Sequence, residues 1–212
     1  MSRSGHRRKT ARRICRLALL LALAVGSLRA EDKAHARTRS SDWAQAVKAA
    51  GVPNLHCVNA SLYRSAQPTA EGMRNLEKLG VKTIVNLRSF HSDRKELRGT
   101  ELAYEHIYMK AWHPEEKELV RFLQIVTDPK RTPVLVHCMH GADRTGTLCA
   151  VYRMVVQGWS TEKALKEMRE GGFNYHEVWK NLPAYVRKLD LTDLRKKAGL
   201  PPLPTPKSGS RP

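Results

Sequence analysis

The sequence predicts a single layered α/β domain, in which a central, mostly parallel sheet is flanked by helices. Two observations support this class. Strand-like and helix-like segments alternate along the middle of the chain, and one nearly continuous apolar run, Val134–His137, is typical of a strand buried on both faces. The length of 212 residues suits one domain, which we expect to span residues 42–199 and to be monomeric.

The elements before this run are short and alternate in type. β-Branched residues that alternate with polar ones indicate strands, and apolar residues three or four positions apart indicate helices. The predicted strands are Leu62–Ser65, Val81–Leu87 and Tyr104–Tyr108; the predicted helices are Asp42–Val47, with Asp42 as its N-cap, Thr69–Leu79 and Glu115–Thr127; a charged loop spans Arg88–Gly99.

The chain after the buried strand is predicted to be mostly helical. Apolar residues recur at helical spacing over Gly146–Val156, Thr161–Glu170 and roughly His176–Leu189, where Pro183 can interrupt the helix. Prolines are frequent after Leu200 and predict a disordered tail over residues 200–212.

The first 30 residues have the order of a secretory signal peptide. They carry eight basic residues and no acidic one, and the apolar block Leu17–Val25 precedes a region of small residues that ends at Ala30. This order predicts cleavage near Ala30 and a periplasmic or secreted protein with a flexible segment over residues 31–41. The alternative is a membrane anchor at the N-terminus. The apolar block is shorter than the roughly 20 residues that a spanning helix needs, so we expect no stable membrane insertion after cleavage.

Cleavage would leave about +10 of the formal charge of +18, and three cysteines, Cys57, Cys138 and Cys149. With an odd number, at least one thiol stays free, and we expect Cys57 and Cys149 to pack against apolar neighbours. The charge permits a catalytically idle binder of anionic polymers. However, the basic residues are not interleaved with aromatic ones, and we expect no nucleic acid partner.

The most informative segment is His137–Gly146, which lies between the buried strand and the next helix. A loop at the carboxyl end of a parallel strand is where α/β folds place their sites. The amides of such a loop, together with the helix N-terminus, form a cage for a phosphate dianion. The residues predicted to surround the phosphate are Met139, His140, Gly141, Ala142, Asp143 and Arg144.

Each residue type in this segment has a separate chemical use. Cys138 is the predicted nucleophile, because amides and a nearby arginine stabilise a thiolate. Arg144 can bind two phosphoryl oxygens at once, which a lysine cannot do. Gly141 permits a tight turn, the hydroxyl of Thr145 can stabilise the departing thiolate, and His137 supports the loop. The segment therefore predicts a cysteine-dependent phosphatase.

Other interpretations of the segment account for fewer of its residues. An inert buried Cys138, or a rhodanese-like sulfurtransferase, leaves the closing Arg-Thr-Gly unexplained. His137, Cys138 and His140 also suggest a metal site, but no further His or Cys pair with ligand spacing accompanies them, and we expect no metal. Arg64 and Arg88 can add positive potential around the mouth of the site, but most such arginines are solvated surface charges, and we leave both outside the site.

The segment resembles the signature of the cysteine-dependent protein tyrosine phosphatases, His-Cys-x5-Arg followed by Ser or Thr. The chain length fits the compact dual-specificity branch. Further segments are similar to the periplasmic bacterial dual-specificity tyrosine phosphatases known for regulating biofilm formation, namely Leu62–Pro68, Val81–Val85, Tyr152–Trp159 and Gly171–Phe173. The resemblance extends from about Trp43 to about Leu189. It implies two-step hydrolysis through a phosphocysteine on Cys138, with Arg144 holding the phosphoryl oxygens and no metal or organic cofactor.

The resemblance leaves the proton donor open. In that family a loop Asp after the strand near Tyr104–Tyr108 protonates the leaving oxygen, but residues 110–116 contain no Asp here. The candidates are Asp143, His113, and Glu115 with Glu116. We place Asp143 first, because it precedes Arg144 and because the myotubularin lipid phosphatases are similar in having an Asp in this loop. Alternatively, Asp143 only orients Arg144 through a salt bridge.

The expected substrate is a phosphorylated protein or a small phosphate ester. Phosphotyrosine is favoured if the pocket is deep and flanked by an aromatic residue. Phosphoinositides and inositol phosphates are the alternative, because a basic pocket with His140 suits a polyanion.

Overall fold

The computed structural model describes residues 40–202. The predicted signal peptide over residues 1–30, nearly all of the segment 31–41 and most of the proline-rich tail lie outside this range. The chain divides into two compact units, Met1–Asp42 and Trp43–Pro212, and the second contains every described helix and strand. Within residues 40–202, no helix combines the length and the apolar character needed to cross a membrane.

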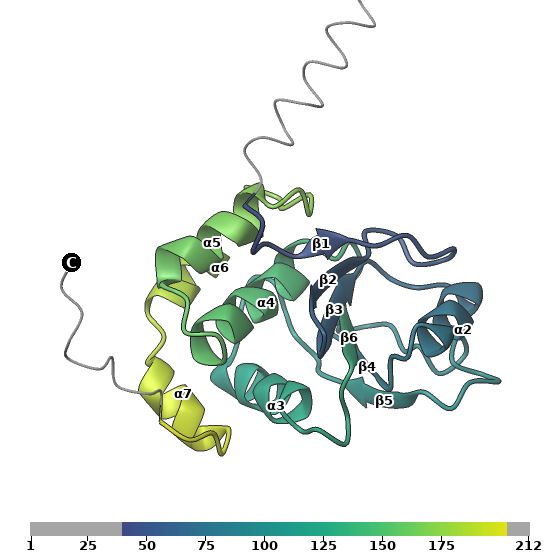
Figure 1. Ribbon diagram of the computed structural model, residues 1–212. Coiled ribbons are helices and arrows are strands. Elements are labelled where there is room, and N and C mark those ends of the chain that lie inside the picture. The colour runs from purple at the N-terminus through teal and green to yellow at the C-terminus, as the bar shows by residue number, and fades with distance from the viewer. Residues whose placement is uncertain (1–39, 203–212) are drawn as a thin grey trace, which may run out of the picture. The chain divides into compact units, whose positions relative to one another are not determined.

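A six-stranded sheet forms the centre of the second unit (Figure 1). The last four strands in its spatial order run parallel to one another, whereas β2 runs antiparallel to both of its neighbours. The order is β1 (Gln45–Ala46), β2 (His56–Asn59), β3 (Leu62–Ser65), β6 (Val134–His137), β4 (Thr83–Asn86) and β5 (Ala103–His106). The prediction of a mostly parallel sheet is confirmed, and the fully buried β6 lies between two parallel neighbours.

Helices cover both faces of the sheet, as predicted (Figure 1). On one face lies α2 (Ala70–Lys78); on the other lie α3 (Glu116–Val126), α4 (Asp143–Val155), α5 (Thr161–Glu170), α6 (Asn181–Arg187) and α7 (Leu191–Lys197). Alternate residues of β6 enter different cores. Leu135 packs with Met73 and Leu76 of α2, whereas Val134 and Val136 join the larger core under α3 and α4.

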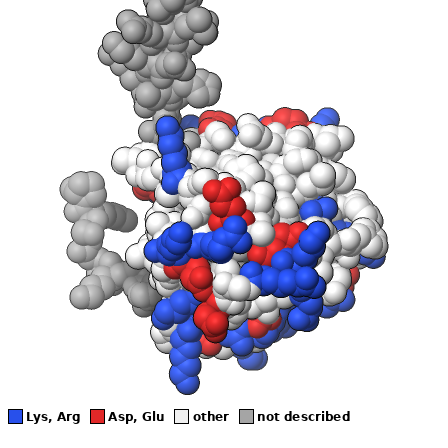
Figure 2. All heavy atoms as spheres, turned by 90° about the vertical axis from the view of Figure 1, so that its right-hand side faces the viewer, with Lys and Arg blue, Asp and Glu red and all other residues white. Residues whose placement is uncertain are grey.

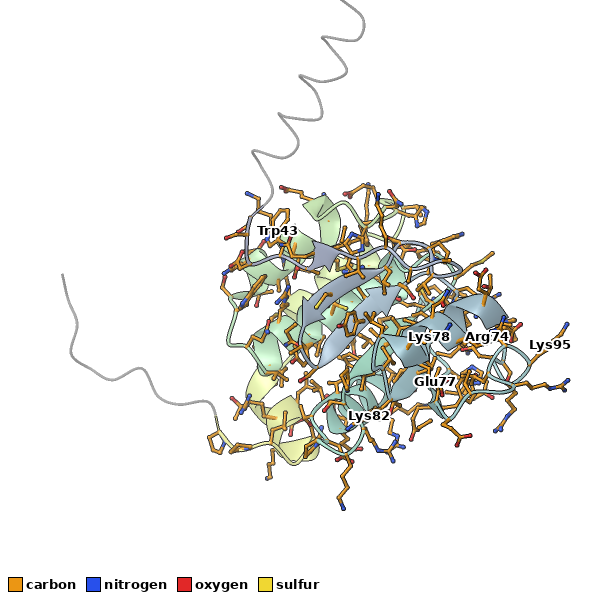
Figure 3. The ribbon with its side chains drawn as sticks, turned by 45° about the vertical axis from the view of Figure 1, so that its right-hand side comes forward. Trp43, Arg74, Glu77, Lys78, Lys82 and Lys95 are labelled. Atoms are coloured by element: carbon orange, nitrogen blue, oxygen red, sulfur yellow. The ribbon has the colours of Figure 1, made fainter. Side chains whose placement is uncertain are left out.

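The surface over α2 carries charges of both signs. Thr69 caps this helix by accepting a hydrogen bond from the Gly72 N–H at 3.1 Å. Arg74 and Lys78 of α2 are exposed, whereas Glu77 is half-buried and accepts a 2.6 Å hydrogen bond from the Glu101 N–H (Figure 3). Figure 2 shows Lys and Arg interspersed with Asp and Glu on this side of the molecule. This face therefore presents a mixture of charges rather than a continuous basic surface.

The predicted helix over Asp42–Val47 is wrong. Gln45 and Ala46 form the short strand β1, which pairs with β2, and β2 itself was not predicted. Six residues are too few to form a stable helix without tertiary support. Here the burial of Trp43 and a 2.6 Å hydrogen bond from the Ala44 N–H to Glu167 Oε1 fix the chain in an extended form instead.

Two helices differ from prediction by more than one residue at an end. The helix after the buried strand begins at Asp143, three residues earlier than expected, so Asp143, Arg144 and Thr145 form its first turn. The helix expected from His176 begins only at Asn181, with Pro183 in its first turn, where the missing N–H costs no hydrogen bond. A separate helix, α7, follows and was not predicted.

Glu118 makes the stability of the fold dependent on pH. This buried residue in the first turn of α3 accepts a 2.9 Å hydrogen bond from the Glu115 N–H. Burial raises the pKa of Glu118 from an ordinary value of 4.5 to about 7. Between these values the folded protein holds a proton that the unfolded chain releases, so stability falls as the pH rises through this window.

We expect Glu118→Gln to increase the free energy of unfolding more at pH 8 than at pH 5. Glutamine keeps a carbonyl acceptor for the Glu115 N–H and has no charge to bury. Urea unfolding of both proteins at the two pH values measures the difference. An equal change at both pH values would contradict the assigned role of Glu118.

Candidate active site

The predicted phosphate loop lies where the parallel strands end. His137, the last residue of β6, is in register with Ser65 of β3 and Asn86 of β4, and Cys138 follows directly. Residues 138–142 then lead into the N-terminus of α4. The structure therefore brings all the predicted phosphate-binding residues to one loop and one helix start, where backbone N–H groups and the helix dipole attract an anion.

Gly141 lets this loop approach β3 closely. Its φ of 69° lies in the left-handed region. A Cβ at this position would lie 2.4 Å from the carbonyl carbon and oxygen of Ser65 and 2.6 Å from the amide nitrogen of Ala66. Both conditions exclude a side chain, so the glycine is required by the backbone path of the loop.

Arg64 supports the loop from below, and the expectation that it is a surface charge is wrong. Its side chain is buried, and Nη2 donates a 2.7 Å hydrogen bond to the carbonyl oxygen of Gly141. The guanidinium lies 3.7 Å from the centre of the Phe173 ring. Burial lowers the pKa of Arg64, which nevertheless brings a positive charge beneath the loop. The sequence did contain a signal, because Leu62 and Arg64 share one face of a strand whose Leu62 is apolar.

Cys138 and Thr145 lie in the buried part of the site. The Cys138 side chain is 2% exposed, and its thiol is free, as are those of Cys57 and Cys149. Cys149 joins the main core as predicted, whereas the half-buried Cys57 donates its S–H to the carbonyl oxygen of Asn59. The Thr145 hydroxyl is buried and has no hydrogen-bond partner within residues 40–202. No hydrogen bond within residues 40–202 therefore competes for this hydroxyl.

Asp93 holds His137 behind the nucleophile and was not predicted. Its Oδ2 lies 2.7 Å from His137 Nε2, with both side chains fully buried, and its Oδ1 accepts a 2.8 Å hydrogen bond from Gln67. Burial raises the pKa of Asp93, but the contacts with His137 and Gln67 outweigh that effect, and the net pKa is lowered. Asp93 comes from the loop after β4, and nothing in the sequence pattern connects it to His137.

Arg144 faces a cavity of about 240 Å³ with aromatic walls. Its Nη1 lies 3.3 Å and 3.4 Å from the carbonyl oxygens of Leu87 and Met109, which orient the guanidinium. The other lining residues are Arg88, Ser89, Phe90, Ala111, Trp112, Met139 and Trp179. Arg88 is therefore part of this cavity rather than an unrelated surface charge.

Asp143 is bound to His176 and forms no ion pair with Arg144 within the described residues. Its Oδ1 accepts a 3.0 Å hydrogen bond from the backbone N–H of His176, and its Oδ2 lies 2.8 Å from His176 Nδ1. The ring of His140 lies edge-on to that of His176 at 5.2 Å. Nothing in the sequence pattern connects His176 with the motif, because it lies 33 residues after Asp143.

The other candidates for the proton donor lie on the turn before α3 and at the start of this helix. His113 is exposed, and its N–H closes a turn with the carbonyl oxygen of Lys110 at 3.2 Å. Glu115 pairs with Lys117 at 2.6 Å, and this contact lowers the pKa of Glu115. Glu116 pairs with Lys197. The ion pair with Lys117 favours the ionised form of Glu115.

Two groups of side chains in the described part of the chain are close enough to share a metal ion. One contains His140, Asp143 and His176, and the other contains His91, Asp93 and Glu96. Neither includes His137 or Cys138, so the set that the sequence suggested is not the set that the fold assembles.

Known proteins with this architecture carry phosphatase names. Residues 41–181 match the family described as DSP-PTPase phosphatase fused to NAD+ kinase. The dual specificity protein phosphatase TpbA of Pseudomonas aeruginosa is 38% identical over 184 residues, which cover 84% of this chain and 83% of that protein.

Solved structures extend the comparison. The crystal structure of Pseudomonas aeruginosa TpbA in complex with phosphotyrosine has a TM-score of 0.68 and 37% identity, over 76% of this chain and 99% of that chain. The core catalytic domain of the PP-IP phosphatase SIW14 of Saccharomyces cerevisiae has a TM-score of 0.61 and 26% identity, over 69% and 92% of the two chains. These similarities confirm the resemblance seen in the motif: the chain belongs to the DSP-PTPase family of protein-tyrosine and dual-specificity phosphatases.

Proposed function

We propose that this protein is a monomeric phosphatase that hydrolyses phosphotyrosine on proteins, and also phosphoserine and phosphothreonine, through a phosphocysteine on Cys138. The observation that carries the proposal is the position of Cys138 directly after β6, on the loop whose Met139 and Arg144 line a cavity with aromatic walls. The similar TpbA structure holds phosphotyrosine, which supports the same substrate here.

The cavity suits an aryl phosphate. Trp112, Trp179, Phe90 and Met139 provide apolar surface for a phenyl ring, while Arg144 lies at the wall that adjoins the phosphate loop. Phe90 and Trp112 are 92% and 61% exposed. A protein substrate can therefore contact these two rings from solvent. An alkyl phosphate would fill less of this apolar space, which favours phosphotyrosine over phosphoserine.

The first chemical step forms the phosphoenzyme. The Cys138 thiolate attacks phosphorus, the S–P bond forms and the P–O bond to the tyrosyl oxygen breaks. Backbone N–H groups of the loop and the Arg144 guanidinium hold the phosphoryl oxygens as charge builds up on them. In the second step water attacks phosphorus and the S–P bond breaks, which releases inorganic phosphate. The free Thr145 hydroxyl is available to the departing thiolate.

We place the proton transfer on the Asp143–His176 pair. Asp143 lies directly before Arg144, and its carboxylate fixes the His176 ring through two contacts. Either the carboxyl group or the imidazole of this pair can deliver a proton to the leaving oxygen and later accept one from water. His113 on the turn over residues 110–113 is the alternative donor.

A small phosphate ester or diphosphate is the second candidate substrate. The SIW14 relative is named as an inositol diphosphatase, and Arg88 adds a second positive charge to the cavity beside Arg144. Residues 110–116 lack an aspartate, which matters less for leaving groups that depart without a proton. Turnover measured on phosphotyrosine peptides, phosphoserine peptides and inositol phosphates decides between these classes, and preference for an inositol phosphate would overturn the main proposal.

We further propose that the protein is exported. The basic, apolar and small-residue order of residues 1–30 supports removal of this segment near Ala30. Intact-mass analysis of protein recovered from outside the cytoplasm should show a chain that begins close to Glu31. A retained N-terminus in a membrane fraction would instead indicate an anchor.

Cys138→Ser should abolish turnover and retain binding of phosphotyrosine peptides, because serine fits the loop but is a far weaker nucleophile at neutral pH. Steady-state kinetics and peptide binding measure the two effects. Arg144→Lys should be almost as inactive, since an ammonium replaces a two-pronged contact. Substantial turnover by the serine variant would rule out the covalent mechanism.

Gly141→Ala should lose phosphate binding and destabilise the fold more than Gly158→Ala does. The two glycines share a φ of 69°, but nothing lies within 4 Å of a Cβ at Gly158. The control therefore isolates the left-handed backbone, which costs about 1–2 kcal/mol. Thermal unfolding and vanadate binding report the extra loss at Gly141, and similar values for both variants would contradict a close approach to β3.

Asp143→Asn and His176→Asn should each slow hydrolysis of ordinary aryl and alkyl phosphates by roughly 10²–10⁴, and much less for an activated aryl phosphate. An activated leaving group departs without a proton, so only a proton donor produces this dependence. An equal loss on all substrates would show that the pair only positions the loop. If His113→Ala alone showed the dependence, the donor would lie on the turn before α3.

A further inference from the structure

The loop between β4 and β5 contains polar atoms that are buried without hydrogen-bond partners. Within residues 40–202, His91 Nε2 and Glu96 Oε2 are both in this condition. They come from one loop and meet at the buried carboxylate of Asp93, and the ligand atoms of the three side chains lie within 4.8 Å of one another. Unpartnered buried polar atoms are costly, so two in one cluster indicate that something else binds there.

The spacing of these atoms suits a metal ion better than a direct hydrogen bond. His91 Nε2 lies 3.5 Å from Asp93 Oδ1 and makes no hydrogen bond with it. Two ligand atoms that each lie about 2.1 Å from a tetrahedral Zn²⁺ are separated by about 3.4 Å. The observed gap is therefore the size that one ion would bridge.

Surrounding contacts hold the cluster in place. Asn86 donates a 2.8 Å hydrogen bond to the carbonyl oxygen of His91, and the backbone N–H of Asp93 donates to the Tyr104 hydroxyl at 3.1 Å. Gln67 fixes Asp93 Oδ1 at 2.8 Å. The first two contacts hold the backbone of the loop, and the Gln67 contact orients the Asp93 carboxylate as outer contacts orient metal ligands.

We propose that His91, Asp93 and Glu96 form a binding site for a divalent transition metal ion, with Zn²⁺ as the type case. One imidazole and two carboxylates match the nitrogen and oxygen ligands of Zn²⁺, and the imidazole disfavours Mg²⁺ and Ca²⁺, which select oxygen. The ion would offset two carboxylate charges and would leave a coordination position for water.

The role of the site is structural, because its ion would bind Asp93, which contacts His137 and not the substrate. The second oxygen of this carboxylate holds His137, the residue before the nucleophile, at 2.7 Å. An ion on Oδ1 would therefore tie the loop after β4 to the base of the phosphate loop. Lys95 of the same loop points into solvent (Figure 3), so it does not compete for the carboxylates.

Zn²⁺ titration of the full chain by calorimetry tests the proposal, in a Cys138→Ser background that removes the thiolate as a competing ligand. We expect one saturable ion with a rise in Tm, because an ion that binds only the folded state stabilises it. His91→Ala and Glu96→Gln should each weaken binding by at least the roughly 10- to 100-fold that follows loss of an outer-shell contact. Neither substitution touches His137.

Two controls assign the ion to this cluster. Glu170→Gln alters an exposed glutamate and should bind Zn²⁺ like the parent. His176→Asn removes one ligand from the other cluster that could share an ion, and this variant should still bind Zn²⁺.

The proposal is overturned if no saturable binding occurs or if His176→Asn alone abolishes binding. It is also overturned if His91→Ala and Glu96→Gln are folded by circular dichroism and bind Zn²⁺ as the parent does. Glu96→Gln is nearly isosteric, so it remains informative if His91→Ala fails to fold.

Discussion

The site depends on the close approach of the phosphate loop to β3. Gly141 lies against the backbone of Ser65 and Ala66, and the buried Arg64 of the same strand donates to the Gly141 carbonyl. This arrangement fixes where the loop turns between Cys138 and Arg144. A burial cost for Arg64 is offset by a charge-assisted hydrogen bond and by the Phe173 ring. The charge also makes the underside of the loop more favourable for an anion.

Two contacts between a carboxylate and a histidine connect the motif with distant parts of the chain. Asp93 holds His137 on the inner side, and Asp143 holds the turn that carries His176 on the outer side. In each case the carboxylate binds a histidine and leaves Arg144 free of an acidic partner within residues 40–202. Arg144 instead rests on two carbonyl oxygens, whose weaker hold keeps the guanidinium available for a phosphoryl group.

The surface over α2 and the cavity beside Arg144 differ in the kinds of side chain that they expose. Over α2, charges of both signs alternate (Figure 2), whereas the cavity beside Arg144 joins two arginines to exposed aromatic rings. Charges of opposite sign on one surface largely cancel at long range, whereas the cavity combines positive and aromatic side chains. This combination suits an aromatic phosphate better than an extended anionic polymer.

The sequence by itself determined the class of fold, the buried central strand and the loop that contains Cys138 and Arg144. These features depend on local periodicity and on residues close together along the chain. The helix Thr161–Glu170 was predicted with its observed bounds, because Ser160 and the apolar spacing act locally. Only the tertiary structure decided that residues 45–46 form a strand, since that strand exists through pairing with β2. It also decided the partners of His137 and Asp143, because Asp93 and His176 are 44 and 33 residues away and meet them only when the sheet and helices pack.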